Sequence, residues 1–429
     1  MISALASAST WFYVNRIVRP EQVARAAAHG SPRGNLSDLY PRWLGARELL
    51  LRGRNPYSEG ITREIQRGYY GRELDAARAR DPRSDEPKDQ QGFAYPVYVV
   101  FLLAPTIGLP FEVVQIGFRW LLIAIAAGSV LLWLRVLHWR VGSIGALSLM
   151  ILLAGWLAMV QGIKLQQLTL LVAGFLAVCA ALLDAGWMFS AGIVLAFATI
   201  KPQLAWPIVA WLLVWALFGW RARWRLLVGF GATMILLLGG AELILQGWLR
   251  MFLAAIGQYH QYTQNQSVLV FLFGAIVGRL LEFLCVMACA ACVWRVRREA
   301  ASSVAFAESL ALVLALTALV VPMFAPYNQV LLVPAILVWL KESAASEAEL
   351  RLPALRVLGF VTAAFLLWPW IATLGLTAAY PWLTPVWRAK IYLLPFYSNF
   401  HVPIFVYGLS LLNTWLNHSE GLREPAMAE

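Results

Sequence analysis

The chain has 429 residues, of which 60% are hydrophobic and only 13% are charged, and its mean hydropathy is +0.67. A water-soluble protein of this size could not bury so much apolar surface, and the long apolar runs differ from the short alternating segments of a transmembrane β-barrel. The net charge of +11 is explained by basic loops that face anionic lipid, because the basic residues are dispersed between apolar runs. We therefore expect an all-α integral membrane protein that binds the lipid bilayer and no nucleic acid.

The apolar runs are roughly 20 residues long, which is enough to cross a hydrocarbon core. They predict a single membrane domain over residues 1–429, with about 12 transmembrane helices. Within it we expect a short first span at 1–18, a re-entrant or short helix at 93–108, a transmembrane bundle at 113–417 and a cytoplasmic tail at 418–429. The runs of the bundle cover residues 113–134, 141–160, 165–183, 187–200, 203–219, 226–246, 268–293, 304–322, 326–340, 354–378 and 400–417.

Residues 19–92 are the only long polar segment, and we expect two surface helices in it. The first covers residues 37–52 and the second covers residues 58–80. In the first, apolar side chains recur at helical spacing, which is typical of an amphipathic helix on a bilayer surface. These side chains are Leu39, Trp43, Ala46 and Leu50.

The start of this first surface helix contains the acidic residue of most interest. Ser37 is predicted to be the N-cap, and Gly53 is predicted to end the helix. Asp38 would then lie in the first turn, where the helix dipole favours a carboxylate.

The charges of the short connections predict the orientation of the bundle. Even numbers of predicted spans separate the basic connections at 135–140, 221–225, 295–298 and 341–351, so these four share a face, which is cytoplasmic by the positive-inside rule. The segment 19–92 joins the outer face if residues 93–108 do not cross, which their prolines and short length favour. We expect a multi-pass protein of a bacterial inner membrane, with its active site on the outer face. The other outer connections are 161–164, 201–203, 247–267, 323–329 and 379–399.

An acidic residue and several cations are predicted to meet on this outer face. Asp38 could deprotonate an attacking hydroxyl, and cations could neutralise a phosphate that is attached to a lipid tail. Simpler alternatives remain open, since Asp38 could only charge a helix start and the lysines could snorkel to the interface. The candidate phosphate-binding residues are Lys201, Arg119, Arg388 and Lys164.

Several segments between residues 36 and 330 occur in an order that is similar to a known family. Residues 38–57 run from Asp-Leu-Tyr to Asn-Pro-Tyr, residues 93–96 read Phe-Ala-Tyr-Pro, and residues 161–168 begin with Gln-Gly. Residues 191–203 run from Ala-Gly to Lys-Pro-Gln, and residues 265–267 are Asn-Gln-Ser. Together these segments resemble glycosyltransferase family 87, which belongs to the polytopic GT-C class. Members of this family look like polyprenyl-phosphate-mannose-dependent mannosyltransferases.

Two departures accompany the resemblance. Val97 stands where the family has a second proline after the tyrosine, and residues 322–329 lack the histidine that the family carries there. Any role for that histidine is therefore in doubt, whereas Asp38 is unaffected.

The resemblance implies a GT-C-like bundle with amphipathic juxtamembrane helices in the first outer loop, and Asp38 as the catalytic carboxylate. The implied activity is inverting transfer of a hexose, with mannose as the candidate sugar, from a polyprenyl monophosphate donor to a lipid or glycan acceptor hydroxyl. No metal or other cofactor is expected. The implied substrate-binding residues are Tyr40, Tyr57, Tyr95, Gln203, Gln161, Asn265, Gln266, Tyr327, Asn328 and Gln329.

Two other functions remain as alternatives. One is a transporter or flippase of a lipid-linked precursor, which should show paired repeats and broken helices at corresponding positions; neither is evident in the sequence. The other is a lipid-linked glycan ligase, which is also polytopic with a large outer loop.

Overall fold

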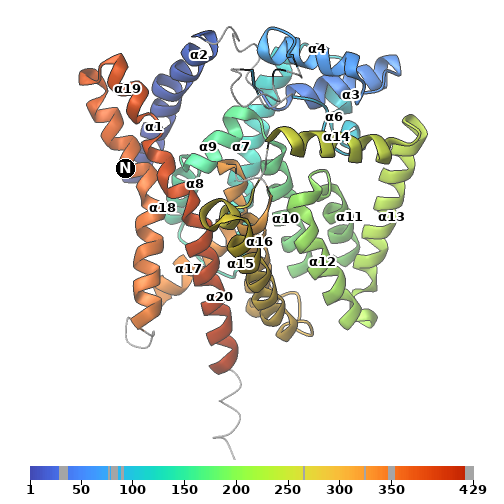
Figure 1. The fold of residues 1–429 in the computed structure, drawn as a ribbon. Coiled ribbons are helices and arrows are strands. Elements are labelled where there is room, and N and C mark those ends of the chain that lie inside the picture. Colours follow the sequence, from blue (N-terminus) through green and yellow to red (C-terminus); the bar gives the residue numbers. More distant parts are fainter. Residues whose placement is uncertain are drawn as a thin grey trace, which may run out of the picture.

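A computed structural model describes residues 1–28, 37–75, 78, 86–87, 91–263, 266–322, 325–345 and 353–420. Its regular structure within these ranges is helical, with no β-strand. A bundle of apolar helices carries a layer of shorter helices at one end (Figure 1). The all-helical fold expected from composition is confirmed for this part of the chain.

Four helices are long and apolar enough to cross a membrane: Phe111–Val136, Trp220–Ile244, Val268–Arg295 and Leu355–Trp382. A fifth crossing is possible if the pair Ser143–Ala154 and Leu157–Leu165, which is bent by 62°, forms one span. Further apolar helices are shorter, at 10–17 residues. These helices indicate a membrane-embedded protein, with fewer full-length spans than the predicted 12.

The bundle helices follow one another along the chain with short connections. Helix α16 (Val304–Val320) lies at the centre, because every residue from Phe306 to Leu319 is buried. The others are α7 (Phe111–Val136), α8 (Ser143–Ala154), α9 (Leu157–Leu165), α10 (Leu168–Asp184), α11 (Met188–Ala198), α12 (Pro202–Phe218), α13 (Trp220–Ile244), α15 (Val268–Arg295), α17 (Val333–Ala345), α18 (Pro353–Ala379) and α20 (Val402–Glu420).

The run at 141–160 is broken rather than continuous, with α8 ending at Ala154 and α9 beginning at Leu157. Gly155 lies at the break, against helix α1 (Ile2–Tyr13). A Cβ at Gly155 would come within 2.3 Å of the Ser7 Cα atom, so only glycine allows this approach. The break therefore depends on a tertiary contact that hydrophobicity alone does not reveal.

The N-terminal helices extend further than predicted. Helix α1 continues through the π-helix η1 (Val14–Val18) into α2 (Arg19–Ala28), so the expected boundary between span and polar loop at residue 18 falls within helical structure. Residues 93–108 contain only α6 (Val99–Leu103) and the 3₁₀-helix η2 (Ala104–Thr106). At the other end α20 runs to Glu420, and residues 421–429 of the predicted tail lie outside the described residues.

The first surface helix is α3 (Tyr40–Arg52), and its start corrects the predicted cap. Leu39 rather than Ser37 is the N-cap residue, and Pro41 follows inside the first turn, where proline is favoured. The Ser37 hydroxyl accepts a hydrogen bond from the Leu39 N–H at 3.3 Å. At the other end, Gly53 adopts φ 64°, a left-handed conformation that suits glycine and ends the helix as predicted.

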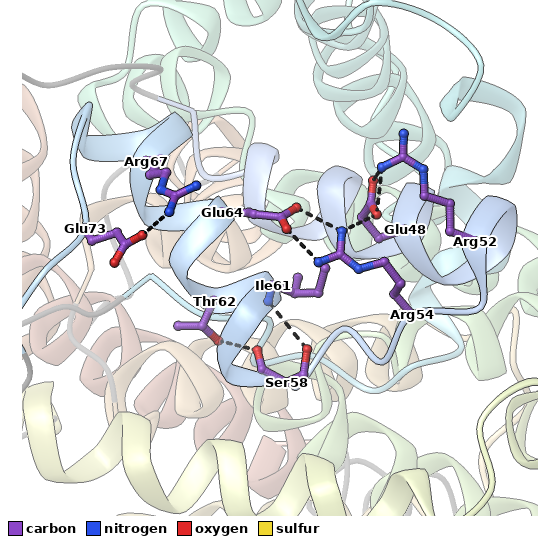
Figure 2. Close-up of polar contacts among 9 residues, drawn as sticks. All are labelled: Glu48, Arg52, Arg54, Ser58, Ile61, Thr62, Glu64, Arg67 and Glu73. Carbon is purple, nitrogen blue, oxygen red and sulfur yellow. Dashed lines mark hydrogen bonds and ion pairs between the residues drawn. The ribbon is translucent and has the colours of Figure 1, made fainter.

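The second surface helix is α4 (Glu59–Tyr70), which ends at Gly71 rather than near Arg80. Figure 2 shows how Arg54 joins it to α3. The Arg54 guanidinium donates to Glu48 at 2.7 Å and to Glu64 at 2.6 Å. Glu48 also accepts from Arg52, so both helices share one network of ion pairs.

Helix α14 (Trp248–Thr263) lies across the end of the bundle, close to α3 and α6 (Figure 1). The same end also carries α2 and α19 (Pro385–Ile391). The remaining short elements are the 3₁₀-helices η3 (Pro326–Leu332), η4 (Tyr380–Trp382) and η5 (Leu394–Phe400). This end of the bundle contains the candidate functional site.

Candidate functional site

A cavity of about 290 Å³ lies at this end, between the surface layer and the bundle. One part of its lining is polar and contains Asp38, Arg42, Tyr95, Gln167, Lys201 and Tyr327. Another part is apolar and includes Ile200, Phe252, Ile256 and Pro322. Phe252 and Ile256 are one helical turn apart on α14, so this helix presents one apolar face to the cavity.

Three separate segments hold Asp38 in place. Its backbone N–H donates to the Leu165 carbonyl at 2.9 Å, which ties the start of α3 to the end of α9. The Tyr69 hydroxyl donates to carboxylate Oδ1 at 2.9 Å, and the Gln167 side-chain amide donates to Oδ2. The carboxylate is therefore oriented by α4 and by the connection before α10. Asp38 precedes the N-cap Leu39, so it does not lie in the first turn of α3 as predicted.

Lys201 faces the same cavity from the connection between α11 and α12. Its side chain is buried, and Nζ donates to Thr169 Oγ1 at 2.7 Å and to Gln167 Oε1 at 3.3 Å. The ammonium also lies 5.1 Å from the centre of the Tyr327 ring. Burial lowers the pKa of Lys201 to about 7, with nearby Arg42 acting in the same direction and Asp38 opposing it. A snorkelling lysine would instead extend its ammonium to water.

Gln167 connects the acid to the cation. Its amide nitrogen donates to Asp38, and its amide oxygen accepts from Lys201. Because an amide offers donors at one end and an acceptor at the other, a single buried side chain fixes both groups. Gln167 was not among the predicted site residues, although it lies in the Gln-Gly segment that contributes to the family resemblance.

Arg42 is a second cation that sequence reasoning missed. It lines the cavity and donates through Nη1 to the Asp38 carbonyl oxygen at 2.8 Å. Its guanidinium lies 4.5 Å from the centre of the Tyr95 ring. The available signal was its position four residues after Asp38, a spacing that would place both side chains on one face of the predicted helix of residues 37–52.

Tyr95 and Tyr327 supply aromatic rings beside these cations. A tyrosine phenol is neutral at pH 7 and can donate a hydrogen bond, and burial raises the pKa of Tyr95 still further. The Tyr57 hydroxyl donates to the Tyr95 carbonyl at 2.6 Å, which links the connection between α3 and α4 to the cavity lining. Gln203 completes the set of predicted residues that line the cavity, with Asp38, Lys201, Tyr95 and Tyr327.

Two predicted residues lie behind the cavity wall. The Asn328 side-chain oxygen accepts from Thr169 at 3.1 Å, and Thr169 in turn accepts from Lys201. Gln329 donates to the Asn399 carbonyl at 2.6 Å, so it joins η3 to η5. These residues support the site rather than line it.

Three of the four predicted phosphate-binding cations are elsewhere. Arg119 is exposed on α7, and Lys164 donates to Gln22 of α2 at 3.2 Å. Arg388 of α19 lies over the Tyr380 ring at 5.2 Å. None of the three is among the described residues of this cavity. Topological parity predicts only the face of the membrane on which a residue lies, so it could not establish that these cations share one site.

The remaining predicted substrate-binding residues also lie apart from the cavity. Tyr40 packs edge-on against Phe111, with ring centres 5.0 Å apart. Gln161 is buried within α9, and Gln266 is exposed before α15. Tyr57 lines a neighbouring cavity. Asn265 lies outside the described residues.

Comparison with protein-family models, with curated proteins and with solved structures finds no match to this chain. Among the described residues there is no group of three or more His, Cys, Asp or Glu side chains that could hold a metal ion. The chemistry of the site therefore has to be argued from its own groups. These are an oriented carboxylate, two cations and three tyrosine side chains around one cavity, with apolar side chains in the same lining.

Proposed function

We propose that this protein is an inverting glycosyltransferase that moves a hexose, with mannose as the candidate sugar, from a polyprenyl monophosphate donor to a lipid or glycan acceptor hydroxyl. The observation that carries this proposal is the Gln167 amide, which holds the Asp38 carboxylate and the Lys201 ammonium at one cavity. A base and a cation held in this way suit a reaction that removes a proton from one oxygen and places negative charge on another.

In the proposed reaction the acceptor oxygen attacks the anomeric carbon while Asp38 takes the acceptor proton. A new bond forms from the acceptor oxygen to the anomeric carbon, and the bond from this carbon to the phosphate oxygen breaks. The polyprenyl phosphate leaves with that electron pair, and the configuration at the anomeric carbon inverts. Lys201 and Arg42 stabilise the departing phosphate, and Asp38 contributes about 10²–10⁴ to the rate.

The apolar wall suits the lipid part of the donor. Ile200, Phe252 and Ile256 lie beside the cations, so a phosphate bound there would have its first isoprene units against hydrocarbon. We further propose that the protein lies in a bacterial inner membrane, with about 12 crossings if the shorter apolar helices also span. In this arrangement the end that carries α3, α4 and α14 faces outward.

The direct test is transfer of a labelled sugar by purified protein. Reconstituted protein is given polyprenyl-phosphate mannose and a mannoside acceptor, and the products are resolved by chromatography and NMR. The proposal predicts acceptor-dependent release of polyprenyl phosphate and an inverted anomeric configuration. Retention of configuration would exclude the single displacement, and movement of intact donor across the vesicle membrane without its cleavage would identify a flippase.

A further inference from the structure

A second cavity, of about 390 Å³, adjoins the first between α4 and α14. The two cavities have four lining residues in common: Gln91, Gly92, Ala94 and Tyr259. A short piece of chain before α6 and one side chain of α14 therefore border both cavities. A group bound in the second cavity would lie next to whatever occupies the first.

The two cavities differ in charge. The first has two cations, Arg42 and Lys201, and one carboxylate, so it attracts an anion. The charged lining residues of the second, among those described, are Glu59 and Arg63, which form an ion pair at 2.5 Å. The rest of its polar lining is neutral: Thr62, Gln66, Gln91, Gln258 and the two tyrosines, Tyr57 and Tyr259. Neutral amides and hydroxyls recognise neutral hydroxylated ligands by hydrogen bonding.

Gln91, one of the shared lining residues, has an unusual backbone conformation. It is buried and has φ 47°, in the left-handed region that few residues other than glycine adopt readily. Backbone strain of this kind persists only where the surrounding structure enforces it, and it is concentrated at binding and catalytic sites. The strained residue here borders both cavities.

We propose that the second cavity is the acceptor subsite and that it takes a neutral, polyhydroxylated group such as the end of a glycan. This inference rests on the proposed function, in which the first cavity holds the donor. The acceptor hydroxyl reaches Asp38 past the wall formed by Gln91 and Gly92. Its oxygen then bonds to the anomeric carbon, its proton passes to Asp38, and the donor phosphate leaves with the electron pair of the broken bond.

One substitution can place a side chain at the second cavity. A Cβ built on Gly92 has only the Thr62 hydroxyl oxygen within 4 Å, at 3.9 Å, and Thr62 lines the second cavity. Gly92→Leu should therefore block the acceptor, and protection of Gln203→Cys by undecaprenyl phosphate is measured in the same variant, because Gly92 also borders the first cavity. Gly60→Leu is the matched control, because Gly60 is exposed on α4 and has open space around it.

The test uses single cysteines in a chain whose four native cysteines are replaced by alanine. Thr62→Cys reports on the second cavity, Gln203→Cys on the first, and Gly60→Cys on exposed α4 surface. Their rates of modification by a maleimide are measured with n-octyl α-D-mannoside, with undecaprenyl phosphate, or with tetraethylene glycol monooctyl ether, which has the same alkyl chain and no sugar.

At ten times its Kd, the mannoside should slow modification of Thr62→Cys about tenfold, and Gly92→Leu should abolish this protection. Undecaprenyl phosphate should protect Gln203→Cys alone, and the sugar-free ether should protect neither. Failure of undecaprenyl phosphate to protect Gln203→Cys would contradict the proposed function itself. If it does protect Gln203→Cys, then absence of mannoside protection at Thr62→Cys, or equal protection by the ether, would overturn the acceptor assignment alone.

Discussion

Lys201 donates to Thr169 and Gln167 and faces a cavity that also contains Arg42. A buried ammonium whose hydrogen bonds go to neutral groups keeps much of its charge for a ligand. Removing it should cost a charge-assisted contact, so Lys201→Ala should weaken binding of undecaprenyl phosphate about 10- to 100-fold. Titration calorimetry would measure this change. Arg119→Ala, at the exposed α7 position, should bind undecaprenyl phosphate as the wild type does. A larger loss of affinity in Arg119→Ala than in Lys201→Ala would contradict the placement of the phosphate.

The protonation of Lys201 predicts a pH dependence. Its lowered pKa, about 7, means that the free protein has a charged ammonium below pH 7 and loses that charge as pH rises. The sugar donor is a phosphodiester that keeps one negative charge throughout, so donor affinity should fall as pH increases from about 6 to 9. In Lys201→Arg the side chain remains charged over this range, and the affinity should be flat. If the affinity of Lys201→Arg instead fell with pH as that of the wild type does, another group would be responsible for the titration.

At the scale of elements, ion pairs join α3 to α4 (Figure 2). Tyr69 of α4 donates to Asp38, which directly precedes the N-cap of α3, so the same pair of helices positions the carboxylate. Glu48 is buried and accepts from Arg52 and Arg54. Glu48→Gln would remove the carboxylate that Arg52 pairs with and one of the two that Arg54 pairs with, and we expect a loss of about 1–3 kcal/mol in the free energy of unfolding. Chemical unfolding followed by circular dichroism would measure it.

The matched control for this prediction is Glu73→Gln. Glu73 pairs with Arg67 in the same layer, but both side chains are exposed. Exposed pairs contribute about 0–1 kcal/mol, so this variant should unfold almost as the wild type does. Equal losses in the two variants would show that burial of Glu48 is not what makes its network important.

Sequence reasoning succeeded where local pattern decides structure. The apolar stripe of residues 39–50 predicted α3, and Gly53 predicted where α3 ends. Both signals act within a single helix. Predictions from the sequence failed where contacts between distant parts of the chain decide the structure. The break at Gly155 depends on α1, and the site role of Gln167 depends on two side chains that only the fold brings together. Asp38 and Lys201 were predicted by charge, whereas Arg119, Lys164 and Arg388 had the same signal and lie elsewhere.

At the scale of the whole molecule, the proposed orientation places α4 outside the cell and the connection after α15 inside. Glu59, whose side chain is 80% exposed, and Arg298, which is exposed at the other end of the bundle, are suitable positions for single cysteines. A membrane-impermeant maleimide added to intact cells should label Glu59→Cys and should label Arg298→Cys only after lysis. The reverse labelling pattern would place the cavity on the cytoplasmic side and would contradict the proposed outer-face active site.

The most direct test of the account is the effect of Asp38→Asn on sugar transfer. This change preserves the shape of the side chain and removes its ability to accept a proton. We predict that turnover with polyprenyl-phosphate mannose falls by about 10²–10⁴, while undecaprenyl phosphate still binds as it does to the wild type. Asp184→Asn, at the far end of α10, should transfer sugar normally. Full activity in Asp38→Asn would contradict the assignment of Asp38 as the base.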